Sequence, residues 1–91
     1  MLIACDLDGT LIDHHGNGNQ QVIAYLRNAK SKGFTVLLWS ARGKHACQQA
    51  VVALGLIDLF DHVMSKPGYI LDDKGWEWAR YTICINDLPT L

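Results

Sequence analysis

The sequence has no apolar run long enough to cross a bilayer, no excess of one charge and few cysteines. The apolar residues Met1 to Cys5 lead directly into Asp6 and Asp8, so we expect neither a signal peptide nor a spanning helix there. Eight basic residues oppose nine acidic ones, giving a formal net charge of -1 without a basic stripe for duplex nucleic acid. These absences predict a cytoplasmic protein that does not bind membranes.

The three cysteines, Cys5, Cys47 and Cys84, are odd in number and far apart in apolar surroundings. This pattern is typical of reduced, buried thiols rather than of disulfides or a metal cluster. The 91 residues, 49% of them hydrophobic, contain no repeat and no linker. We therefore expect a single globular domain over residues 1–91.

Short apolar runs alternate with helical patterns along the chain. A run of this kind, flanked by polar residues, is typical of a strand buried on both faces of a parallel sheet. The alternation predicts an α/β fold, Rossmann-like and three-layered, with a mostly parallel sheet. Strands are expected at 2–5, 34–39, 61–65, 69–71 and 81–85, and helices from about residue 20 to Gly33 and from about Lys44 to Gly55.

The predicted strands end in polar residues, and ligands of such sheets bind beyond the carboxyl ends of the strands. The first strand leads into the sequence Asp6-Leu7-Asp8-Gly9-Thr10. Residues two apart project to the same side, so both carboxylates can face one cavity, while Gly9 lets the chain bend away. Two acids in one pocket are costly unless a divalent cation neutralises them, and hard oxygen ligands suit magnesium.

Asp6 to Thr10 resembles the first signature of phosphatases of the haloacid dehalogenase superfamily. Three later segments are similar to the other motifs of that family, in the same order, and together they cover almost the whole chain. They are Ser40 after an apolar strand, Lys66 before Pro67, and Asp72-Asp73 after residues 69–71.

The resemblance implies a magnesium-dependent phosphomonoester hydrolase. Asp6 would attack phosphorus and become an aspartyl phosphate, and Asp8, able to hold a proton at working pH, would act as general acid and then general base. Ser40 would hold phosphate oxygens, Lys66 would supply positive charge, and Thr10 would support the turn.

Magnesium would be held by Asp6, by the main-chain carbonyl of Asp8, and by Asp72 or Asp73. The spacing between Lys66 and Asp72 is short for the family, and Asp87, in Asn86-Asp87 after another apolar run, is the alternative metal ligand. We prefer Asp72 and Asp73 at this stage.

Neither usual position for a cap domain has room for one, since residues 13–19 form only a flap-sized loop. An open site would admit a bulky phosphorylated substrate, whether a small molecule, a polymer end or a protein, or would be covered by another subunit of a homo-oligomer.

Other residues near the motifs have two interpretations each. Arg42 could bind a substrate anion or simply lie exposed at the helix start, and His14 and His15 could reach substrate but are more typical of a solvent-facing loop. Cys5 is interpreted as a core residue whose thiolate the nearby carboxylates disfavour. For Trp76 and Trp78 we prefer packing on the core or the sheet edge to stacking on a sugar or base of the substrate.

Two other functions fit parts of the pattern. A receiver-like signalling module also combines acids, a hydroxyl residue and a Lys-Pro pair, but it needs an acid after the third strand, where this chain has Ser65. A phosphate-binding protein that kept the scaffold without hydrolysis is the other alternative.

Overall fold

The computed structural model of the chain describes residues 1–75, 79 and 81–88. Within these residues, three strands and two helices alternate and are followed by one short 3-10 helix. The strands are β1 (Leu2–Asp6), β2 (Thr35–Ser40) and β3 (His62–Ser65); the helices are α1 (Gln20–Ser31), α2 (Lys44–Leu54) and η1 (Ile85–Asp87). The predicted βαβαβ order of the first 65 residues is confirmed.

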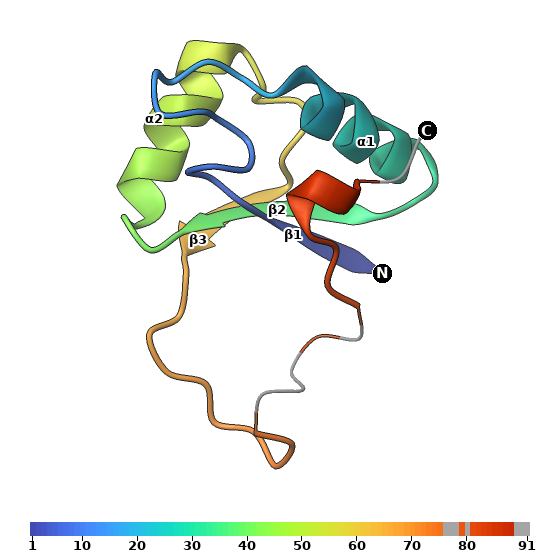
Figure 1. The fold of residues 1–91 in the computed structure, drawn as a ribbon, viewed down its shortest axis with the longest axis vertical. Helices are drawn as coiled ribbons and strands as arrows, with labels where there is room; N and C mark the ends of the chain where they lie inside the picture. The colour runs from blue at the N-terminus through green and yellow to red at the C-terminus, as the bar shows by residue number, and fades with distance from the viewer. Residues whose placement is uncertain (76–78, 80, 89–91) are drawn as a thin grey trace.

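The three strands form one parallel sheet in the order β1-β2-β3. Both crossovers step in the same direction, and right-handed crossovers of that kind place their helices on the same face. Figure 1 shows α1 and α2 together above the sheet. The described residues thus build the sheet layer and one helical layer of a Rossmann-like α/β fold.

The core lies between the sheet and these helices. Each buried stripe follows the period of its element, with Val22, Ile23, Leu26 and Ala29 along α1 and Val36 and Leu38 on one side of β2. Leu38, in the central strand, and Leu7, just after β1, have no exposed surface. These two buried leucines are next to the strand ends that carry the polar residues, so the core holds those strand ends in place.

Helix ends are fixed by backbone and side-chain hydrogen bonds. Asn19 caps α1 by accepting hydrogen bonds from the N–H groups of Gln21 and Val22, and Gly55 ends α2 in the left-handed conformation. Asp61 accepts a hydrogen bond of 2.8 Å from the N–H of Val36 and forms an ion pair of 3.0 Å with Lys30. This contact joins α1 and β2 to the start of β3.

The expected strands at 69–71 and 81–85 are wrong. Tyr69 and Leu71 are fully exposed, and no strand of the described residues pairs with them, while Ile85 begins a 3-10 helix instead of ending a strand. Three apolar residues between Pro67-Gly68 and Asp72-Asp73 form too short a ladder to persist without burial. In Figure 1 the chain after β3 makes a long loop that extends away from the sheet.

η1 returns the chain to the body of the protein, where Ile85 and Leu88 pack against the core cluster. Trp76 and Trp78, considered above for packing or stacking, lie outside the described residues. Among the residues that are described, no helix has the length and apolar character that a membrane span requires.

Candidate active site

Parallel register brings the ends of the three strands to one edge of the sheet. Asp6 is paired with Trp39, and Ser40 is paired with Ser65. The N–H of Lys66 donates a hydrogen bond of 2.9 Å to the carbonyl of Ser40, which extends the pairing by one residue. Three of the motif segments therefore meet at this edge, as the sequence predicts.

The loop after β1 is a tight turn that exposes its acids. The carbonyl of Leu7 accepts hydrogen bonds from the N–H groups of Leu11 and Ile12, and the N–H of Gly9 donates to Ile12 at 2.8 Å. Gly9 has a φ of 79°, which a side chain would disfavour. The buried side chain of Leu7, between Asp6 and Asp8, anchors the turn.

Asp6 lies between a hydroxyl and a cation. Thr10 donates a hydrogen bond of 3.3 Å to Asp6 Oδ2, and Lys66 Nζ lies 3.7 Å from Asp6 Oδ1. The Asp6 side chain is 37% exposed, so one side of the carboxylate remains open to solvent. The predicted proximity of Asp6, Thr10 and Lys66 is present in the structure.

Ser40 is the buried polar residue of the site. It is 2% exposed, and its Oγ accepts a hydrogen bond of 3.0 Å from the N–H of Arg42. Its carbonyl also accepts hydrogen bonds from the N–H groups of Gly43 and Lys66. Ser40 thus fixes the turn from β2 into α2 and the start of the segment that carries Lys66.

The guanidinium group of Arg42 donates two hydrogen bonds to the carboxylate of Asp8. Nε donates to Asp8 Oδ2 at 2.7 Å and Nη2 donates to Asp8 Oδ1 at 2.8 Å. These hydrogen bonds hold the pKa of Asp8 below its usual range, with the charge of Arg42 and a contact from Ser40 acting in the same direction. In this arrangement Arg42 stabilises the ionised form of Asp8, whereas the predicted role as general acid needs a proton on that carboxylate.

Asp72 and Asp73 are exposed and lie in the loop beyond β3. The structure does not bring them beside Asp6 and Asp8, since no three acids, histidines or cysteines form a metal-binding group among the residues described. Asp72 instead accepts a hydrogen bond of 2.8 Å from the N–H of Lys74. Asp87, the alternative ligand, belongs to η1. Which acid acts as a metal ligand stays a prediction.

The donors at the strand edge agree in kind with magnesium, which takes one or two carboxylates and keeps several waters. Asp6 and Asp8 are such hard oxygen donors on one turn. In the structure each is matched by a cation of the chain itself, Lys66 for Asp6 and Arg42 for Asp8.

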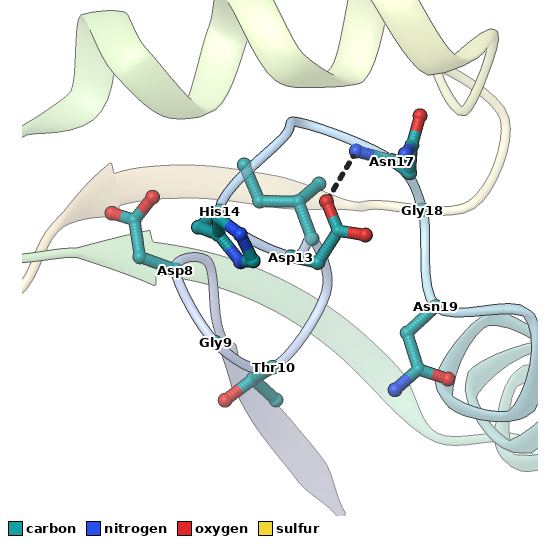
Figure 2. Close-up of a pocket in the computed structure, with 9 residues that line it drawn as sticks. Asp8, Gly9, Thr10, Asp13, His14, Asn17, Gly18 and Asn19 are labelled. Atoms are coloured by element: carbon teal, nitrogen blue, oxygen red, sulfur yellow. Dashed lines mark hydrogen bonds between the residues drawn. The ribbon is translucent and has the colours of Figure 1, made fainter.

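A pocket of about 710 Å³ adjoins the site on the flap side. Figure 2 shows its lining along residues 8–19, where Asp13 caps the loop by accepting a hydrogen bond of 2.9 Å from the N–H of Asn17. His14 lines the pocket and His15 is exposed beside it, with their rings 4.0 Å apart. Asp8 and Thr10 line this pocket but Asp6 and Ser40 do not, so the pocket lies beside the group formed by Asp6, Ser40 and Lys66.

Cys5 is confirmed as a core residue. It is 6% exposed, and burial together with the charge of Asp6 raises the pKa of its thiol to about 12.

The position of Trp39 beside the site was not predicted from the sequence. Lys66 Nζ lies 5.9 Å from the centre of the Trp39 ring, and the strand register, which places Trp39 beside Asp6, is the signal that could have found it.

Comparison with known proteins identifies the family of the chain. The family model of the haloacid dehalogenase-like hydrolases matches residues 3–84. The chain therefore belongs to the haloacid dehalogenase-like hydrolases, a family whose members generally use magnesium.

One curated relative is the protein of Bacillus subtilis (strain 168) named "Putative phosphatase YxeH". It is 32% identical to this chain over 72 residues, which cover 79% of the chain. The chain spans 27% of the length of that relative. No solved structure matches the chain.

Proposed function

We propose that the chain carries the nucleophile and the phosphate-binding part of a magnesium-dependent phosphomonoesterase. The observation that supports this most is the meeting of Asp6, Ser40 and Lys66 at the carboxyl edge of the sheet, from three separate segments. Membership of a hydrolase family and the name of the relative are in line with the proposal.

Asp6 is the proposed nucleophile. Its half-open carboxylate attacks phosphorus and forms an aspartyl phosphate while the leaving oxygen departs. Lys66 and the hydrogen bond from Thr10 orient the carboxylate of Asp6. Ser40 positions the backbone N–H groups and charge that surround the phosphoryl oxygens.

Asp8 is the proposed acid and base. It gives a proton to the leaving oxygen in the first step and removes one from water in the second, which regenerates Asp6. This role requires an Asp8 oxygen that is free of Arg42.

Asp6, the main-chain carbonyl of Asp8 and an acid from the later segment would hold magnesium. The ion would supply positive charge against the phosphate and the two carboxylates. The substrate is proposed to be a phosphomonoester, and the cytoplasm is the proposed compartment. Assembly as a homo-oligomer is a further proposal.

The test is hydrolysis of an aryl phosphate with magnesium by the chain and by Asp6→Asn. The variant replaces a nucleophilic oxygen without changing size, so turnover should fall below detection while the circular dichroism spectrum stays the same. Asp58→Asn is a matched control, because Asp58 pairs with Arg27 on an exposed surface, and it should keep full turnover. Undiminished hydrolysis by Asp6→Asn would refute the proposal.

The position of Asp72 and Asp73 favours a second candidate, a phosphate-binding protein without turnover. These acids lie away from Asp6 in the described structure, so the site there has two acids and two cations. Calorimetric binding of a phosphorylated ligand without release of phosphate would support that candidate over the enzyme.

A further inference from the structure

The charges at the strand edge cancel within the chain. Asp6 is matched by Lys66 and Asp8 by Arg42, so the four side chains have no net charge when each pair is closed. A phosphate dianion needs positive charge and donors that are not already used. A cation that changes its partner from a carboxylate to phosphate would supply both the charge and the donors.

Arg42 is the cation best suited to such an exchange. Its planar fork matches the spacing of phosphate oxygens as well as that of a carboxylate, whereas a lysine acts as a point charge. The two side chains of the Arg42–Asp8 pair are 58% and 50% exposed. Because solvent screens an exposed pair of this kind, opening it costs little.

The backbone around Arg42 is fixed even though its side chain is exposed. The N–H of Arg42 donates to the buried Ser40 Oγ, and the N–H of Gly43 donates to the Ser40 carbonyl. Gly43 has a φ of 101°, and a side chain there would contact Ser65 Oγ at 3.6 Å. Only the side chain of Arg42 needs to move, and it moves from a point anchored beside Ser40.

From this geometry we propose that Arg42 acts as a latch on Asp8 that the substrate opens. In the empty site the Arg42 side chain pairs with Asp8, and when substrate binds, it pairs with the phosphate group instead. This exchange provides a donor pair for the phosphate and at the same moment frees both oxygens of Asp8. Binding of the correct ligand and release of the acid are therefore one event. The latch rests on the proposed phosphate site, but it does not require turnover.

The test measures the Kd for inorganic phosphate by calorimetry at fixed pH, ionic strength and magnesium concentration. Four proteins form a cycle: the unaltered chain, Asp8→Asn, Arg42→Met and the double variant. Asp8→Asn removes the competing charge, so phosphate should bind roughly two- to fivefold more tightly, the scale of an exposed ion pair. Arg42→Met should weaken binding roughly three- to tenfold.

The double variant decides between a latch and a simple charge effect. If Asp8 competes for Arg42, the gain from Asp8→Asn disappears in the Arg42→Met background. If Asp8 only repels phosphate, the gain persists there, and the latch is refuted. An unchanged Kd in Arg42→Met, or an absence of phosphate binding in all four proteins, would also refute it.

Two further variants separate the fork from the charge. Arg42→Lys keeps the charge but not the fork and should recover only part of the affinity. Lys44→Met removes a charge two residues along the chain and should leave the gain from Asp8→Asn intact. The cycle reports binding alone, so the latch can hold even if Asp6→Asn shows that the chain hydrolyses nothing.

Discussion

Residues 1–65, which contain the three strands, and the segment that begins at Lys66 differ sharply in how their polar residues are held. In the first part each strand end is held by register and its polar residue has a defined partner, as Ser40 does. In the second, Tyr69 and Leu71 are fully exposed and Asp72 contacts only its own turn among the described residues. Strand pairing therefore brings site residues together at one edge, whereas the loop after Lys66 holds its acids away from that edge.

The largest expected effect is on stability and compares the two parts directly. Leu38→Ala removes a side chain without exposed surface from the central strand, and it should lower the free energy of unfolding by about 2–5 kcal/mol. Leu71→Ala changes a fully exposed leucine and should stay within about 0.5 kcal/mol. Urea denaturation followed by circular dichroism measures both, and equal losses would show that the later segment is packed in solution.

The next effect tests whether the later segment completes the metal site. Asp72→Asn and Asp73→Asn should each be compared with Asp87→Asn for the magnesium concentration that gives half-maximal hydrolysis. Loss of a ligand should raise that concentration at least about tenfold, since even outer partners of a ligand cost that much. We expect the increase at Asp72 or Asp73; an increase at Asp87 alone would move the fourth motif to η1.

A smaller effect separates two serines that end neighbouring strands. Ser40 Oγ and Ser65 Oγ each accept a hydrogen bond of 3.0 Å from a backbone N–H. Ser40→Ala removes a buried acceptor and should cost about 1 kcal/mol, whereas Ser65→Ala, at an exposed residue, should cost less. Only Ser40→Ala should also lower kcat/KM for an aryl phosphate, because Ser40 lies beside Arg42. Equal kinetic losses would assign Ser40 a structural role alone.

The smallest effect concerns acid. The hydrogen bond from the N–H of Val36, followed by the contact with Lys30, lowers the pKa of Asp61. A lowered folded pKa stabilises the fold above the unfolded value of about 4, and this contribution is lost as pH falls through the folded value. The urea concentration at the midpoint of unfolding should therefore decrease as the pH falls below about 4. Asp61→Asn should make that midpoint less dependent on pH. Asp58→Asn is the control, and an equal reduction there would exclude a special role for Asp61.

The sequence predicts well what alternation and burial determine. Asp6, Ser40 and Lys66 are found together because parallel strands end at one edge, and the buried stripe of α1 follows from its spacing. The strand that we expected at 69–71 does not form, because three apolar residues do not reveal whether a neighbouring strand is available for pairing. The Arg42–Asp8 pair joins residues 34 apart, which no local pattern can indicate.

The order β1-β2-β3 has a consequence for behaviour at high concentration. Among the described residues, each outer strand is paired with another strand on one side only, which leaves a row of its backbone N–H and C=O groups without a strand partner. Such an edge accepts a strand from a second molecule. With four residues β3 offers a short template and β1, with five, a longer one, so self-association by added strands should begin at the N-terminal edge.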